Sequence, residues 1–149
     1  MQDDIDSAER RGGTSNLINS MMLERNQLLN LLVQTSTKDS NGEDVFDRES
    51  LDEFCQVMVD YIAAGHFGLY ERIVEGTERR RGVADLAVEL YPHIEKTTQA
   101  ALAFNEKYDA ARENTNASQL HQDLSELGEH LTNRIEYEDQ IIQKLSEPK

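Results

Sequence analysis

The feature that most constrains this chain is its apolar periodicity, which keeps helical spacing over four long stretches. Such spacing places apolar side chains on one face of an α-helix. The predicted helices run from about Ser15 to Thr35, Arg48 to Glu75, Val83 to Ala110 and Ser118 to Leu145. Only two prolines and eight glycines interrupt the 149 residues, and residues that favour helices dominate. No strand pattern competes with them.

Short polar connections between helices favour antiparallel neighbours. We therefore predict an all-α fold, an antiparallel up-down-up-down four-helix bundle that forms a single domain over residues 1–149. Pro92 predicts a kink in the third helix, since proline removes a hydrogen bond and clashes with the preceding turn. We expect a short disordered start over roughly residues 1–8 and a loop over residues 35–47. Ser50 and Glu53 have the spacing of a capping box, which would shift the start of the second helix slightly.

The charge of the chain restricts its partners. With 29 acidic and 15 basic residues the net charge is −14, which repels nucleic acid and anionic membranes and attracts basic protein surfaces. The alternative is that the charge only keeps the protein soluble. The first ten residues lack the apolar core of a signal peptide, and no apolar run is long enough to span a membrane. The lone cysteine, Cys55, fits a reducing compartment, so we expect a cytoplasmic protein.

Several polar residues fall on the inward faces of the predicted helices. This buried polar network consists of Glu24, Tyr61, His66, His93 and Glu138. A buried Glu138 without a partner would cost several kcal/mol or be protonated, so we predict that Tyr61, His66 or His93 reaches it. A metal site is the alternative, but the Glu-x-x-His pairs of di-iron bundles are missing. We predict no metal and no cofactor, and the lack of a catalytic motif indicates that the protein is not an enzyme.

The second helix carries an apolar stripe on each of two opposite faces. Its inner stripe is mostly apolar, whereas Phe67 lies about half a turn away from the stripe's centre. The outer stripe consists of Asp60, Ala63, Phe67, Tyr70 and Glu71. Aromatic anchors rimmed by charges are typical of partner interfaces, so we interpret these five residues as partner-binding. The alternative is that the first turns of the chain, or a second copy, cover them.

The stretch "DEFCQVMVDYIAAGHFGLYERI", residues 52–73, resembles the Rsd/AlgQ family of regulators of the bacterial housekeeping sigma factor. "ERNQLL" before it, and "YPHIEKTTQAALAFN" and "NRIEYEDQII" after it, extend the resemblance over roughly residues 8–146. It implies an anti-sigma factor with a helical-bundle fold. The implied partner is the C-terminal domain of the sigma factor, which reads the −35 promoter element and contacts core polymerase. Asp60 and Phe67 match family positions implicated in sigma binding.

Two other readings stay open. The same stripe could bind another basic protein, which would make this chain an acidic adaptor. The bundle could also be a metal-binding sensor similar in architecture to hemerythrins, in which His66 and Glu138 would hold the metal. The polar interior could in addition serve a small ligand or a second protein partner.

Overall fold

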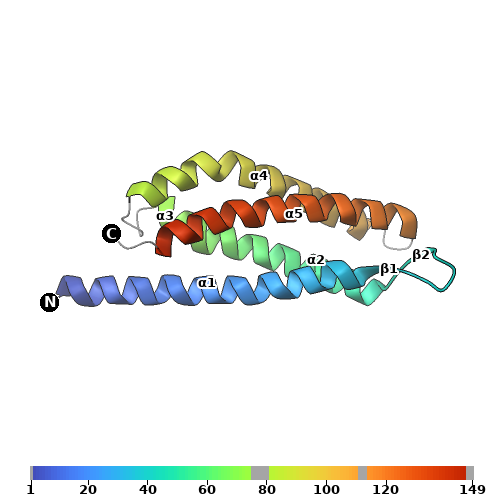
Figure 1. Ribbon diagram of the computed structural model, residues 1–149, viewed down its shortest axis with the longest axis horizontal. Helices are drawn as coiled ribbons and strands as arrows, with labels where there is room; N and C mark the ends of the chain where they lie inside the picture. The colour runs from blue at the N-terminus through green and yellow to red at the C-terminus, as the bar shows by residue number, and fades with distance from the viewer. Residues whose placement is uncertain (1, 75–80, 111–113, 147–149) are drawn as a thin grey trace.

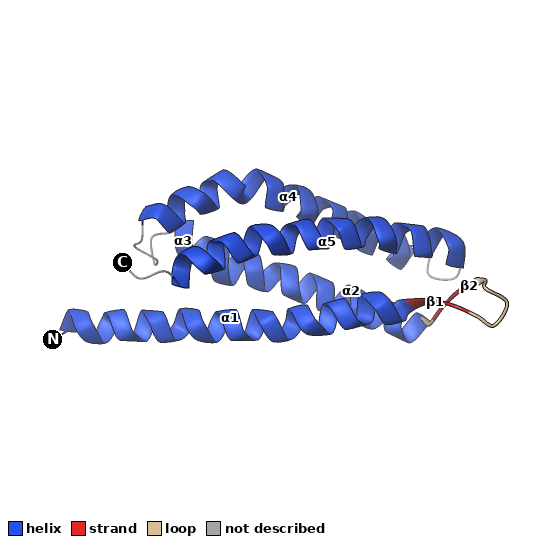
Figure 2. Cartoon of the chain, in the orientation of Figure 1, coloured by secondary structure: helices blue, strands red, loops and turns tan. Residues whose placement is uncertain are grey.

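The computed structural model describes residues 2–74, 81–110 and 114–146. Long helices lie side by side along the longest axis of the molecule, and a small hairpin projects at one end (Figures 1 and 2). The all-α prediction is therefore confirmed, with the hairpin as an exception. The alternating up-and-down order and the kink stay predictions. Most of the predicted connection after the second helix, at 75–80, and residues 111–113 lie outside the described residues.

The first helix is longer than the apolar pattern indicated. α1 (Gln2–Thr35) starts well before the predicted Ser15. Its backbone is helical over residues 2–8, where we expected disorder. No proline or glycine occurs over residues 2–11, which favours a helix there, and α1 continues through Gly12 and Gly13 although glycine disfavours a helix.

The segment predicted as a loop after α1 contains a two-stranded hairpin. β1 (Ser36–Lys38) pairs antiparallel with β2 (Asp44–Phe46), with Lys38 opposite Asp44. The turn depends on Gly42, whose φ of 78° is a left-handed conformation that favours glycine. The Asp39 carboxylate fixes the turn by accepting hydrogen bonds from the backbone N–H groups of Asn41 and Glu43.

The predicted second helix is one helical path with three parts. α2 (Arg48–Ala63) is followed by the π-helix η1 (Ala64–Tyr70) and by α3 (Glu71–Val74). Its N-cap is Asp47, whose side chain accepts hydrogen bonds from the backbone N–H and the hydroxyl of Ser50. Ser50 is therefore a donor to the cap rather than the cap itself. The π-helix is the main departure from the predicted α-helix.

The third and fourth long helices follow the predicted boundaries closely. α4 (Arg81–Ala110) contains Pro92, and α5 (Ala117–Ser146) closes the bundle. α1 packs mainly on α2 and η1, and α4 packs mainly on α5.

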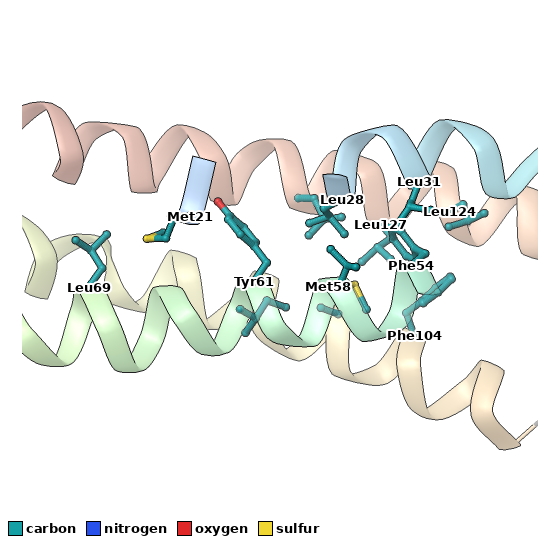
Figure 3. Close-up of a cluster of buried hydrophobic side chains, with 14 of the residues drawn as sticks. Met21, Leu28, Leu31, Phe54, Met58, Tyr61, Leu69, Phe104, Leu124 and Leu127 are labelled. Atoms are coloured by element: carbon teal, nitrogen blue, oxygen red, sulfur yellow. The ribbon is translucent and has the colours of Figure 1, made fainter. Parts of the chain in front are cut away.

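The core changes character along the bundle (Figure 3). Near the hairpin it is apolar, and the rings of Phe54 and Phe104 meet edge to face with centroids 5.9 Å apart. The side chains that fill this end are all buried: Leu28, Leu31, Phe54, Met58, Phe104, Leu124 and Leu127. Farther from the hairpin, Tyr61 points its hydroxyl away from α2 into the interior, where charged side chains are buried as well.

Candidate functional site

The five residues of the outer stripe differ in how exposed they are. Asp60 is exposed on α2, and Phe67 on η1 is 64% exposed. Ala63 and Glu71 are half-buried. Tyr70, also half-buried, stacks on Tyr91 of α4 with ring centroids 4.6 Å apart. The surface therefore offers one exposed aromatic ring and one exposed carboxylate, which accepts a hydrogen bond from Gln56, and Tyr70 is anchored to the bundle.

A second carboxylate lies close to this surface. Glu24 of α1 is half-buried, and its Oε2 is buried without a hydrogen-bond partner among the described residues. Burial, and then the negative charge of Asp60, raise the pKa of Glu24 above its ordinary value. We predicted that Glu24 belongs to the buried polar network, but it makes no hydrogen bond to the other members. It faces α2 at the edge of the outer stripe, where it adds negative potential that favours a basic partner.

The π-helix determines how Phe67 leaves the bundle. In this segment backbone hydrogen bonds skip one residue more than in an α-helix, and the Glu71 N–H bonds to the His66 carbonyl. Single π-helical turns are rare and are frequently found at functional sites. Phe67 is held at its edge by the His66 ring, whose centroid lies 4.8 Å away.

Two glycines allow η1 to pack closely on its neighbours. A Cβ atom on Gly65 would lie 2.9 Å from Glu138 Oε2 and 3.4 Å from Arg134 Nη2. A Cβ atom on Gly68 would lie 2.6 Å from Leu17 Cδ1. The π-helix is therefore in direct contact with α1 on one side and with a buried charged pair of α5 on the other.

Tyr61 and Glu138 form the centre of the buried polar network. Tyr61 donates its hydroxyl to Glu138 Oε1, so of the three predicted partners it is Tyr61 that reaches this carboxylate. Burial and the neighbouring Glu138 carboxylate raise the pKa of Tyr61, which keeps the hydroxyl protonated as a donor. Arg134 Nε donates to Glu138 Oε2 at 3.1 Å, and Arg25 Nη2 lies 3.5 Å from Glu138 Oε1. Glu138 is only 2% exposed, and the two guanidinium groups that face it compensate for its burial.

The two arginines connect this centre to the rest of the bundle. Arg134, 1% exposed, donates to the hydroxyl of Thr98 at 2.7 Å and to that of Thr97 at 3.3 Å, both on α4. Arg25 donates to the Tyr61 hydroxyl at 2.9 Å and to Asp139 Oδ1 at 2.7 Å. The network therefore joins all four long helices, and sequence reasoning missed both arginines.

A signal for these arginines was present in the sequence. Arg134 lies seven residues after Leu127 and four before Glu138, which is the inward phase of α5. Arg25 lies four residues after Met21 and is likewise in phase. Phase alone does not place an arginine in the interior, because charged residues are rarely buried unless they are paired.

The two predicted histidines do not take part in the network in the way expected. His93 is exposed and stacks on Tyr137 of α5, with ring centroids 5.2 Å apart. It lies three residues after the buried Leu90, about 60° off the centre of the inward stripe at helical spacing. His66 is half-buried and stacks on Tyr70, with centroids 6.0 Å apart. It therefore contacts Phe67 and Tyr70 of the outer stripe and takes no part in the hydrogen bonds around Glu138 that the structure shows.

Other kinds of site find little support. In the described part of the chain, no three histidine, cysteine, aspartate or glutamate side chains gather so that they could hold a metal ion. Burial raises the pKa of the Cys55 thiol to about 11, which keeps it protonated and unreactive. Among the described residues, no helix has the length and apolar character that a membrane span needs.

Comparison with known proteins agrees with the resemblance seen in the sequence. The family model described as regulator of RNA polymerase sigma(70) subunit, Rsd/AlgQ, matches residues 1–146. A regulator of sigma D from Enterobacter sp. (strain 638) is 37% identical over 142 residues, which cover 90% of this chain and 82% of the relative. Proteins of the same name from Yersinia enterocolitica and Salmonella arizonae are 31% and 34% identical, over 93% and 90% of this chain and 86% and 84% of their own length. This chain therefore belongs to the Rsd/AlgQ family of regulators of the RNA polymerase sigma(70) subunit.

Proposed function

We propose that this protein binds the C-terminal domain of the housekeeping sigma factor through the outer stripe. The observation that carries the proposal is Phe67, whose side chain is 64% exposed within an acidic surround. Membership of a family of sigma(70) regulators indicates the partner. A large ring that water surrounds in the free protein is the kind of side chain that anchors a protein interface.

The proposed mechanism is occlusion. A domain that reads promoter DNA is basic because it faces phosphates, and a protein with a net charge of −14 competes for that surface by charge. While the domain is held, sigma contacts neither the promoter nor core polymerase, and alternative sigma factors compete better in stationary phase. The protein acts in the cytoplasm, without catalysis or a cofactor and without contact with nucleic acid or membrane.

The proposal includes the course of the bundle. We infer that successive long helices run in opposite directions and that Pro92 bends α4, because short connections and a missing backbone hydrogen bond favour these features. An acidic adaptor for a different basic protein remains the alternative use of the same stripe, and a second protein partner would bind elsewhere.

Calorimetric titration of the isolated C-terminal domain of sigma into this protein tests the proposal. We expect saturable one-to-one binding that weakens as salt rises, because part of the attraction is between exposed charges. Phe67→Ala should weaken the affinity by about thirtyfold, or about 2 kcal/mol, as loss of a central aromatic anchor does. Asp60→Arg should act mainly by slowing association.

Val33→Ala provides the matched control for Phe67→Ala. Val33 is 74% exposed, but it lies on α1 near the hairpin, so its truncation should leave the affinity within about twofold. Wild-type protein that binds no sigma domain at either salt would refute the proposed partner. Equal losses for the two truncations would refute the proposed surface while leaving the partner in place.

A further inference from the structure

We propose that Gly65, Arg134 and Glu138 are positioning residues for the partner-binding surface, because they hold the π-helix that sets the direction of Phe67. This inference rests on the proposed function for its consequence in binding. All three residues are buried, and Arg134 and Glu138 are 1% and 2% exposed.

The outer stripe is divided by a change of helix type. Asp60 and Ala63 belong to α2, whereas Phe67 and Tyr70 belong to η1. A π-helix takes more residues for each turn than an α-helix, so each residue in η1 lags behind the phase that α2 would have given it. The angle between the Asp60 carboxylate and the Phe67 ring therefore depends on η1 remaining a π-helix.

A π-helix of this length needs support from its surroundings, because the α-helical hydrogen-bond pattern is the common one. The support comes from α5. Glu138 Oε2, held at 3.1 Å by Arg134 Nε, lies where a Cβ atom on Gly65 would be only 2.9 Å away. Neither partner can yield easily, since Glu138 also accepts from Tyr61 and Arg134 also donates to Thr98.

The contact at Gly68 differs in this respect. A Cβ atom there would meet Leu17 Cδ1 at 2.6 Å, which is the end of a flexible and half-buried side chain. Leu17 can turn away at little cost, whereas the carboxylate facing Gly65 is fixed by two hydrogen bonds. Gly65 is therefore the position at which an added methyl group must displace the π-helix itself.

A stack of aromatic rings transmits the position of η1 to Phe67. The His66 ring meets Phe67 edge to face at 4.8 Å and is stacked on Tyr70 at 6.0 Å. Tyr70 is stacked in turn on Tyr91 of α4 at 4.6 Å. A shift of the backbone at Gly65 changes where this stack begins, and with it the direction in which the Phe67 ring leaves the surface.

A double-mutant cycle tests the inference. Gly65→Ala should weaken the binding of the sigma C-terminal domain by about tenfold. In a Phe67→Ala background the same substitution should weaken binding by less than about twofold, because the ring whose direction it changes is missing. Gly128→Ala on α5 is the matched control. Its Cβ atom would lie 3.4 Å from the flexible end of Leu32, and the variant should bind like the wild type.

Amide hydrogen exchange provides a readout that needs no partner. Gly65→Ala should speed exchange selectively over residues 64–71, and Gly128→Ala should leave that segment unchanged. If the wild type binds no sigma domain but this selective effect is seen, the proposed function fails and the positioning role stands. Unchanged exchange over residues 64–71 would overturn the positioning role, whatever the partner. Losses of affinity that add fully in the cycle would overturn it as well.

A milder variant serves if Gly65→Ala does not fold. Thr98→Val removes the hydroxyl that accepts from Arg134 Nη1 at 2.7 Å and keeps the shape of the side chain. It should reproduce the selective exchange over residues 64–71 and the coupling to Phe67→Ala. A fully folded Thr98→Val protein with wild-type exchange and wild-type affinity would contradict the inference.

Discussion

The bundle interior differs between its hairpin end and the layer beneath the π-helix, called the polar end here, where charged side chains are buried beside apolar ones such as Leu69 and Ile141. Near the hairpin the core is filled by aliphatic side chains and by the Phe54 and Phe104 rings. Beneath the π-helix, Arg25 donates to the Tyr61 hydroxyl, the hydroxyl donates to Glu138, and Glu138 also accepts from Arg134. Apolar contacts are non-directional and tolerate repacking, whereas charged hydrogen bonds in a dry interior permit few arrangements.

The difference indicates that the two ends contribute differently: one mainly to the free energy of folding, the other mainly to the orientation of the helices. Burial of apolar surface at the hairpin end supplies free energy of folding without choosing one helix rotation strongly. A buried ion pair contributes little net stability compared with apolar packing, but breaking it is costly. The proposed partner surface lies over the polar end, where the direction of a side chain matters most.

The largest test of this comparison is removal of the central carboxylate. Glu138→Ala leaves two guanidinium groups buried without their shared partner, and we expect a loss of about 3–5 kcal/mol in the free energy of unfolding. Urea denaturation followed by circular dichroism measures it. A loss below about 1 kcal/mol would mean that Arg134 and Arg25 find other partners readily, and the polar end would then be as adaptable as the apolar one.

Volume-conserving substitutions at the two ends sharpen the comparison. Leu127→Met at the apolar end should cost less than about 1.5 kcal/mol, because methionine fills nearly the same space. Glu138→Gln at the polar end also keeps its volume, but should cost about 1.5–3 kcal/mol since hydrogen bonds to a charged group are lost. The same denaturation measurement applies. Similar losses in the free energy of unfolding at both sites would show that the two ends tolerate substitution equally.

The smallest expected effect concerns Glu24, at the edge of the polar end. Its pKa is raised in the folded protein by burial and by Asp60, so its protonation favours folding. That contribution is fully present below the ordinary glutamate pKa, and it is lost as pH rises through the raised value.

Glu24→Gln should therefore melt at a slightly higher temperature than the wild type at neutral pH and lose this part of the pH dependence. Melting curves between about pH 4 and pH 7 check this. Glu126→Gln, at an exposed position of α5, is the control and should follow the wild-type profile. A Glu24→Gln protein that follows it too would contradict a raised pKa of Glu24 from burial and from Asp60.

The long elements were predictable because their signal is repeated many times. α5 spans Ala117–Ser146, against a prediction of Ser118 to Leu145, since each apolar residue adds to the same period. The hairpin was missed because strands of three residues contain too few positions to show alternation. They form where α1 ends and Gly42 turns the chain back.

The exposure of Phe67 was predictable, but the π-helix that carries it was not. The projection assumed a constant α-helical period, which η1 does not follow after Ala64. The glycines of this segment approach Glu138 and Leu17 closely, and such contacts between distant segments leave no periodic trace in the sequence.

The polar interior was predicted in part for a similar reason. Helical phase placed Tyr61 and Glu138 inside, and their contact follows from the need to satisfy a buried carboxylate. Phase alone could not decide between Glu24 and Arg25, which lie on either side of the same stripe. That choice is made by the neighbours of α1, because Arg25 faces Asp139 of α5 and Glu24 faces α2.

The hairpin offers a place to attach a reporter group. It lies at the end of the bundle opposite α3 (Figure 1), and the tip residues Ser40, Asn41 and Gly42 are exposed. The turn is held by Asp39 and by the Lys38–Asp44 ion pair at 2.5 Å, none of which involves the Ser40 side chain. A fluorophore on a cysteine introduced at Ser40 would thus report the tumbling of the protein in complexes without altering its recognition surface, while the half-buried Cys55 would label slowly because its raised pKa keeps the thiol protonated.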